Sequence, residues 1–224
     1  MTNPTIMPNP TERVFCVSYY EGDLDVLKYS NDNFVVYFKG DRNKLAFDSF
    51  QDSRKEWIEN TGYNISTYLK YIEDHYENLP GVTVFCKSSV YPRHLSEQTF
   101  ERLCKKDIFT PLVEPDRWKL SYPITFVTSA GDYLEINDSW YARGRRGRYF
   151  NDFDSFFSFL FPKARHPTDV KFAPGANFVV PKANILNRSR SFYRNLSLLI
   201  EYESHSLESF FAERALDAIF CSSL

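Results

Sequence analysis

Three short, nearly continuous apolar segments place the strongest constraint on how this chain folds. They cover residues 14–20, 34–38 and 82–86, and are rich in Val, Phe, Tyr and Cys. Because side chains alternate between the two faces of a strand, such runs indicate strands that are covered on both faces. Turn-forming residues follow the first two segments, at 21–23 and 39–41. The pattern predicts a layered α/β protein with buried parallel strands.

The clearest helix is expected between the second and third strands. Its apolar stripe is formed by Ile65, Tyr68, Leu69, Ile72 and Tyr76, which recur with helical spacing. Other helices are expected at 96–104, 153–161, 181–202 and 208–220, with a hairpin at 124–136, whereas residues 42–60 carry no clear pattern. No repeat or linker interrupts the chain, so we expect one domain at 13–224 after a flexible tail at 1–12.

Composition and motifs exclude several common classes of protein. Hydrophobic residues make up 43% of the chain and aromatic residues 17%, enough to bury a core and still line a site. The net charge of −2 is unlike that of a general nucleic-acid binder. The chain contains no G-x-x-x-x-G-K-[ST], G-x-G-x-x-G, G-x-S-x-G or H-E-x-x-H motif, which argues against P-loop enzymes, dinucleotide oxidoreductases, common hydrolases and zinc proteases.

Segment properties predict a cytoplasmic protein without a membrane span. No apolar run approaches the roughly 20 residues that cross a bilayer. The polar, Pro-rich first dozen residues lack the regions of a secretory signal. The four cysteines are scattered, which favours a reducing compartment over a disulfide framework or a zinc site.

Polar and aromatic side chains follow each of the three predicted strands. They are Tyr19, Tyr20, Glu21, Asp23 and Asp25 after the first, Lys39, Gly40 and Asp41 after the second, and Lys87, Ser88, Ser89, Arg93 and His94 after the third. Parallel strands end at one edge of a sheet, where α/β proteins bind ligands. Rings there can stack on a base while lysine and arginine meet phosphates. The pattern predicts a nucleotide-diphosphate site; the alternative is a set of solvated loop residues.

A series of short motifs runs in a fixed order along nearly the whole chain. They are VSYYEGDL (17–24), YFKG (37–40), NTGYN (60–64), TYLKYI (67–72), YENLP (76–80), VTVF (82–85), PGANFVV (174–180), IL (185–186), FY (192–193) and ERA (213–215). In this order they resemble an uncharacterised family of GT-A-type, glycosyltransferase-like proteins found in bacteria and large DNA viruses.

The resemblance implies a GT-A-like, Rossmann-like mixed sheet flanked by helices. Residues 13–95 would form a nucleotide-sugar-binding half and residues 96–224 an acceptor-side half. The implied enzyme is a hexosyl- or pentosyltransferase that moves a sugar from a nucleotide-diphosphate donor to a hydroxyl of a glycan or glycoconjugate. If the chain is virus-encoded, the expected location is the host cytoplasm.

The chain departs from the GT-A pattern where a metal is usually held. Such enzymes carry Asp-x-Asp after an internal strand, and its carboxylates bind a divalent ion that neutralises the diphosphate. Here the third strand is followed by Lys87-Ser88-Ser89. The sequence therefore does not decide whether the site binds a Mn²⁺ or Mg²⁺ ion, and Asp23 and Asp25 are the weak candidate ligands. Lys87, Arg93 and His94 are the expected phosphate-binding groups instead of a metal or beside one.

Other donor-binding and acceptor-binding candidates come from loops. Gly62 and Asn64 open the predicted helix at 65–76, whose N-terminus favours an anion or merely needs a cap. Gly175 and Asn177 form a turn that lets backbone approach a substrate. The basic run at 143–148 is either a phosphate-binding loop or a solvated face.

Sugar transfer by an inverting enzyme needs a carboxylate that removes the acceptor proton. The candidates are Asp138 first, then Glu135, then Glu213. Trp140 and Tyr141 are expected to stack on an acceptor sugar, although Trp140 is equally suited to a core position.

The alternative function is a non-catalytic carbohydrate- or nucleotide-binding module on the same scaffold. A third hypothesis, an enzyme that acts on nucleic acid, is supported only by the basic run at 143–148.

The choice of base gives a first testable prediction. Replacing Asp138 by Asn is expected to abolish sugar transfer while leaving donor binding intact, because the amide keeps the shape but cannot take the proton. Single-turnover transfer and donor binding are the two measurements. Unchanged transfer in the Asp138→Asn protein would remove Asp138 as the base.

Overall fold

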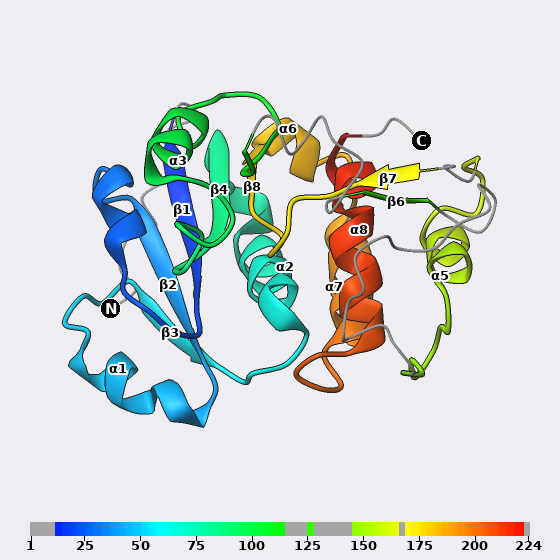
Figure 1. Cartoon of the computed structure of the whole chain (residues 1–224), viewed down its shortest axis with the longest axis horizontal. Helices are drawn as coiled ribbons and strands as arrows, with labels where there is room; N and C mark the ends of the chain where they lie inside the picture. The colour runs from blue at the N-terminus through cyan, green and yellow to red at the C-terminus, as the bar shows by residue number, and fades with distance from the viewer. Residues whose placement is uncertain (1–11, 115–124, 128–144, 166–168, 222–224) are drawn as a thin grey trace.

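A six-stranded mixed sheet forms the centre of the computed structural model, which describes residues 12–114, 125–127, 145–165 and 169–221 (Figure 1). Its strands are β1 (Arg13–Tyr19), β2 (Phe34–Lys39), β3 (Lys55–Ile58), β4 (Val82–Lys87), β5 (Thr110–Pro111) and β8 (Phe178–Pro181). They lie in the order β3-β2-β1-β4-β8-β5. Strands β1 to β4 are parallel, and β8 runs antiparallel to both of its neighbours. The expected mixed sheet flanked by helices is confirmed.

The direction of strand addition reverses at β1. From β1 the chain adds β2 and then β3 on one side, and α2 (Tyr63–His75) then carries it back to β4 on the other side. Open α/β sheets bind ligands beyond the carboxyl ends of the two strands that flank such a reversal. In the β1–β4 register Ser18 pairs with Lys87, so this point lies at the residues that the sequence singled out.

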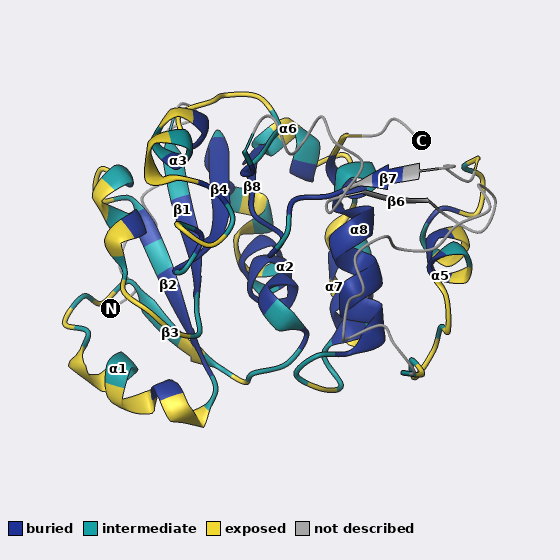
Figure 2. Ribbon diagram, viewed as in Figure 1, coloured by how far each residue is buried: buried dark blue, intermediate teal, exposed yellow. Residues whose placement is uncertain are grey.

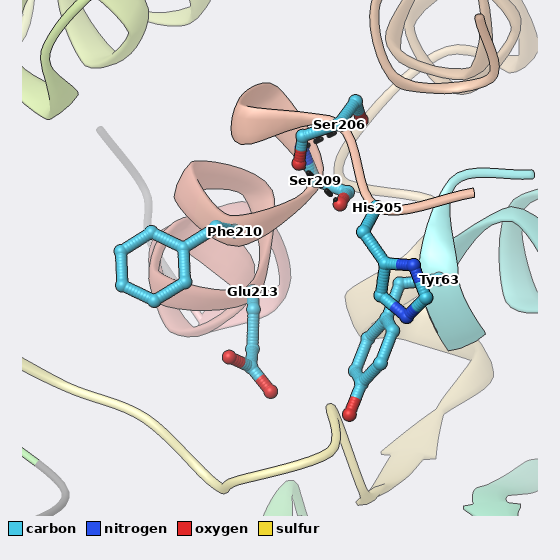
Figure 3. Close-up of a pocket in the computed structure, with 6 residues that line it drawn as sticks. All are labelled: Tyr63, His205, Ser206, Ser209, Phe210 and Glu213. Carbon is cyan, nitrogen blue, oxygen red and sulfur yellow. Dashed lines mark hydrogen bonds between the residues drawn. The ribbon is translucent and has the colours of Figure 1, made fainter. Parts of the chain in front are cut away.

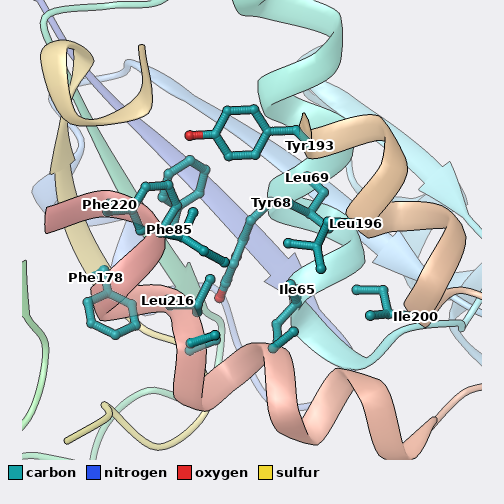
Figure 4. Close-up of a cluster of buried hydrophobic side chains, with 14 of the residues drawn as sticks. Ile65, Tyr68, Leu69, Phe85, Phe178, Tyr193, Leu196, Ile200, Leu216 and Phe220 are labelled. Atoms are coloured by element: carbon teal, nitrogen blue, oxygen red, sulfur yellow. The ribbon is translucent and has the colours of Figure 1, made fainter. Parts of the chain in front are cut away.

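Helices cover both faces of the sheet because the strand side chains are apolar on both faces. Phe15, Val36 and Val84 belong to a core covered by η1 (Asp25–Tyr29), α1 (Lys44–Ser49) and α3 (Glu97–Leu103). Cys16, Tyr37 and Phe85 belong to a larger core on the opposite face. That core packs against α2, α7 (Arg190–Ile200) and α8 (Leu207–Cys221), as Figure 4 shows for Tyr68, Leu196 and Phe220.

Helix α8 is buried around nearly its whole circumference (Figure 2). It contacts α2 and α7 on the side of the main sheet, and α5 (Phe153–Leu160) and α6 (Lys182–Ile185) elsewhere. It also contacts β7 (Asp169–Lys171), which pairs antiparallel with β6 (Thr125–Val127) in a second sheet. A helix in this position is expected to be apolar all round, so its buried charges, Glu208, Glu213 and Arg214, need specific partners.

Most of the elements expected from the sequence are present. The three buried strands and the helices at 63–75, 97–103, 153–160 and 207–221 are confirmed. The segment at 181–202 is interrupted between α6 and α7, and residues 42–60 form η2 (Asp41–Asn43), α1 and β3. Of the expected hairpin, the first arm is β6, whose described partner is β7; the second arm lies outside the described residues.

Gly62 precedes α2 with a left-handed φ of +59°, and it is tightly packed. A Cβ atom there would lie 2.9 Å from Ser66 Cβ and 3.1 Å from Ile200 Cγ1. Gly22 is also left-handed, with φ +91°, but its nearest neighbour would be 3.9 Å away. Gly62→Ala is therefore expected to lower the free energy of unfolding by about 2–4 kcal/mol and the control Gly22→Ala by about 1 kcal/mol, as measured by urea denaturation. An equal decrease in the free energy of unfolding of both variants would contradict the conclusion that close packing requires glycine at position 62.

Candidate functional site

The candidate site lies where β1 and β4 end and β8 begins. Because β8 is antiparallel to β4, the turn that precedes β8 reaches the same edge of the sheet as Lys87. The side-chain oxygen of Asn177 accepts the Lys87 backbone N–H at 3.0 Å and fixes this junction. Five elements meet here: the ends of β1 and β4, the start of α2, the turn at 173–177 and helix α8.

Lys87 is the most unusual charged residue at this edge. Its side chain is 6% exposed, and within the described part of the chain its ammonium group makes no hydrogen bond or ion pair. Burial lowers the pKa of Lys87 to about 8; nearby Arg93 adds to the lowering, while Glu213 and Glu21 oppose it. A buried charge without a close partner is costly, so this position is well suited to receive an anion.

Gly175 forms the wall beside Lys87. Its φ is +81°, and a Cβ atom there would lie 3.1 Å from both Lys87 Cε and His94 Nε2. The Gly175 N–H donates to Glu213 Oε1 at 2.6 Å, and its carbonyl accepts from Asn64 Nδ2 at 3.3 Å. The glycine thus brings Lys87 and His94 together, while α2 and α8 hold its peptide groups.

Two buried polar side chains behind Gly175 lock the elements together. Asn64 is 6% exposed, and its oxygen accepts from Ser18 Oγ on β1 at 3.1 Å. Glu213 is 4% exposed and is paired with Arg214 at 2.8 Å. The Arg214 guanidinium in turn lies 3.1 Å from the centre of the Phe210 ring. Asn64 and Glu213 therefore contribute to the rigidity of the edge.

The loop after β1 packs against the loop after β4. Ser88 Oγ donates to the Glu21 carbonyl at 2.7 Å. The Glu21 carboxylate lies 3.7 Å from the guanidinium groups of both Arg42 and Arg93, and all three side chains are more than half exposed. Arg42 also covers the Tyr20 ring at 3.5 Å. The two loops together bring Tyr20, Glu21 and Arg93 to this edge.

Tyr19 and the two aspartates of the same loop make local contacts. The Tyr19 hydroxyl donates to the Gly22 carbonyl at 3.0 Å, and its ring packs on Phe38. Asp23 accepts the Asp25 N–H at 3.1 Å, so one candidate metal ligand caps the backbone of the other. Among the described residues no group of three His, Cys, Asp or Glu side chains is placed to hold a metal ion. The donor set that a GT-A metal requires is thus not assembled in the described part of this edge.

Lys39 ends β2 but points into the protein. Its ammonium donates to Ser66 Oγ at 2.6 Å, to the Thr61 carbonyl at 2.8 Å and to the Tyr63 carbonyl. These acceptors use all three donors of the ammonium group. Burial lowers the pKa of Lys39 to about 7, and Glu201 opposes the shift. In this structure Lys39 holds the start of α2, and a contact with phosphate would have to break these bonds.

The start of α2 is occupied by backbone groups of the turn between α7 and α8. The N–H groups of Gly62 and Tyr63 donate to the carbonyls of Glu203 and Ser204 at 2.9 and 3.0 Å. These two donors are therefore already used within the fold. Gly62 acts as a close-packing position, and Asn64 as the buried link to Gly175.

Four sequence candidates lie outside the described residues: Glu135, Asp138, Trp140 and Tyr141. Of the basic run at 143–148, residues 145–148 are described. The buried Glu208 carboxylate accepts the N–H groups of Tyr149 and Phe150 at 2.7 and 3.1 Å, and Arg145 pairs with Glu203 at 3.2 Å. This part of the basic run is therefore anchored to the end of α7 and the start of α8.

Sequence reasoning missed Tyr63 and His205, which line a small cavity beside Glu213 (Figure 3). The other lining residues are Ser206, Ser209 and Phe210. Tyr63 stood within a quoted motif, but no pattern in the sequence marked its left-handed backbone, with φ +56°. His205 gave no signal because the Tyr63 ring beside it comes from a distant part of the chain.

Comparisons with known proteins do not add to this picture. No family model matches the chain, and it matches neither a curated protein nor a solved structure. The likeness to GT-A-type proteins therefore stays a prediction. In the described ranges, no helix has both the length and the apolar composition that crossing a bilayer requires.

The two buried lysines give a testable contrast. Lys87→Met is expected to raise the free energy of unfolding by about 1–3 kcal/mol, because it removes a buried charge without a close partner. Lys39→Met is expected to lower it by about 2–4 kcal/mol, because it leaves buried acceptors unsatisfied. Urea denaturation at pH 6 is the measurement, since this pH lies below the folded pKa of both lysines, about 8 and about 7. A lower free energy of unfolding in both variants would contradict the interpretation that the Lys87 charge destabilises the fold.

Proposed function

We propose that this protein is a glycosyltransferase that moves a sugar from a nucleotide-diphosphate donor to a hydroxyl of a glycan or glycoconjugate. The observation that carries the proposal is the largely buried Lys87 side chain at the strand reversal between β1 and β4, whose ammonium group has no bonded partner in the described chain. A diphosphate placed there would supply the missing negative charge. The order of motifs that resembles GT-A-type proteins supports the same class of ligand.

The neighbouring groups suit the parts of such a donor. Arg93 extends the positive edge beyond Lys87, His94 lies beside Lys87 at Gly175, and Glu21 bridges Arg93 and Arg42 at the rim. Gly175 has no side chain, which lets the Lys87 and His94 side chains pack directly against this turn. Tyr20, stacked under Arg42, offers an aromatic edge for the base or the sugar.

The proposed reaction is the attack of an acceptor hydroxyl oxygen on the anomeric carbon of the donor. The new carbon–oxygen bond forms as the bond to the diphosphate breaks, and the diphosphate leaves with the electron pair. Asp138 is the first candidate to take the hydroxyl proton, followed by Glu135 and Glu213, and Lys87 stabilises the charge on the leaving group. The described carboxylates do not fit a metal at this edge, so no step is assigned to one.

A non-catalytic binding module is the second candidate. It is favoured by the engagement of Glu213, the one described candidate base, whose oxygens already accept from Gly175 and Arg214. A module of this kind would bind a carbohydrate or a nucleotide without turnover.

The test is a thermal-shift screen with UDP-, GDP- and dTDP-sugars, with and without Mn²⁺. A ligand that binds the folded state raises the melting temperature, and we expect such a shift together with slow donor hydrolysis. A shift with free glycan and none with nucleotides would favour the lectin-like module. No shift with any of these donors would count against the transferase.

The pH dependence of donor binding tests the role of Lys87. The charged form binds the diphosphate and the pKa of free Lys87 is about 8, so affinity for the donor is expected to fall as pH rises from about 7 to about 9. Lys87→Gln should lower affinity about tenfold at pH 7 and flatten the profile. The control Lys44→Gln changes an exposed lysine and should leave both unchanged. An unaltered profile in Lys87→Gln would exclude Lys87 as the phosphate ligand.

A further inference from the structure

A small cavity with an aromatic rim lies between the start of α2 and helix α8 (Figure 3). Its floor is formed by the buried residues Ser206, Ser209 and Glu213, and its rim by the half-buried Tyr63 and His205. The cavity measures about 10 Å³, which is close to the space that one water molecule needs. It can therefore receive a single hydroxyl group but not a whole sugar ring.

The rim is held in a strained conformation. Tyr63 has φ +56°, which is a genuine outlier for a bulky residue. Its N–H donates to the Ser204 carbonyl at 3.0 Å, and its carbonyl accepts from Lys39, so the surrounding structure fixes it. Strain of this kind persists only where neighbours enforce it and is concentrated at functional sites. The result is that the Tyr63 ring lies beside the His205 ring, with centroids 5.6 Å apart.

The floor is directly connected to the edge that carries Lys87. Glu213 lines the cavity, and its Oε1 also accepts the N–H of Gly175, whose Cα region packs against Lys87. A carboxylate has about four lone-pair positions, and the described contacts of Glu213 use two of them. Glu213 can therefore accept one more hydrogen bond from a hydroxyl in the cavity.

We propose that this cavity binds one hydroxyl group of a sugar whose ring packs against Tyr63 and His205. Its role as the acceptor subsite rests on the proposed function, since Glu213 then orients the acceptor hydroxyl next to the donor edge at Lys87. An aromatic rim suits the apolar face of a sugar ring, and a buried carboxylate suits its hydroxyl. Burial lowers the pKa of His205, Arg145 and Lys39 add to the effect and Glu203 opposes it, so the shift favours the neutral ring.

The test uses saturation-transfer NMR with methyl glycosides of glucose, galactose, N-acetylglucosamine and xylose. Wild-type protein is expected to give signals with at least one of them, and Tyr63→Asn is expected to lose those signals. Asn tolerates left-handed backbone better than Tyr, so the melting temperature of Tyr63→Asn should not fall. His205→Gln removes the other ring and leaves the strained residue Tyr63 unsubstituted. It should weaken the same signals.

Trp57→Ala is the matched control, because Trp57 is a partly exposed ring on the edge strand β3. It should leave the glycoside signals unchanged. Absence of signals from all four glycosides with wild-type protein would overturn the proposal, as would equal signals from wild type, Tyr63→Asn and His205→Gln. Failure of the proposed function is seen separately, in the absence of any thermal shift with nucleotide sugars. Glycoside binding without nucleotide binding would support the cavity and remove its role as an acceptor subsite.

Discussion

The hydrogen bond from the Gly175 N–H to Glu213 fixes the turn at the carboxyl edge of the sheet. It attaches the turn before β8 to the buried helix α8, while Asn64 holds the other side of the same glycine from α2. Through Gly175 both contacts bear on Lys87, at the end of β4. The carboxyl edge of the sheet is therefore built from segments that lie 38 to 111 residues apart in sequence, and its shape depends on burying a carboxylate in α8.

Charges inside this fold are of two energetic kinds. Lys39 and Glu208 are satisfied by backbone and side-chain groups of their own protein, and they fix the start of α2 and the segment at 149–150. Lys87 has no such partner among the described residues. Since desolvating an ammonium group costs free energy, Lys87 is a liability to the isolated fold that an anionic ligand would relieve. This contrast distinguishes a candidate binding residue from structural lysines of the same type.

Strain and packing point to the same part of the molecule. Gly62 and Tyr63, which are both left-handed, directly precede Asn64 in the chain. Asn64 in turn donates to the carbonyl of Gly175, the first residue of the left-handed pair Gly175-Ala176. Close packing requires glycine at both first positions, since a Cβ atom there would lie within 3.1 Å of neighbouring side chains. The second residue of each pair then follows in an uncommon conformation, and in one pair this turns the Tyr63 ring toward His205.

The sequence by itself determined the buried strands, the amphipathic helix at 63–75 and the set of polar residues after β1 and β4. It could do so because alternation, helical spacing and turn residues are local properties of a chain. It could not distinguish Lys39 from Lys87, since both follow apolar strands and only their distant acceptors separate them. Only the tertiary structure decided that difference and formed the Tyr63–His205 cavity, because both depend on contacts between residues far apart in the chain.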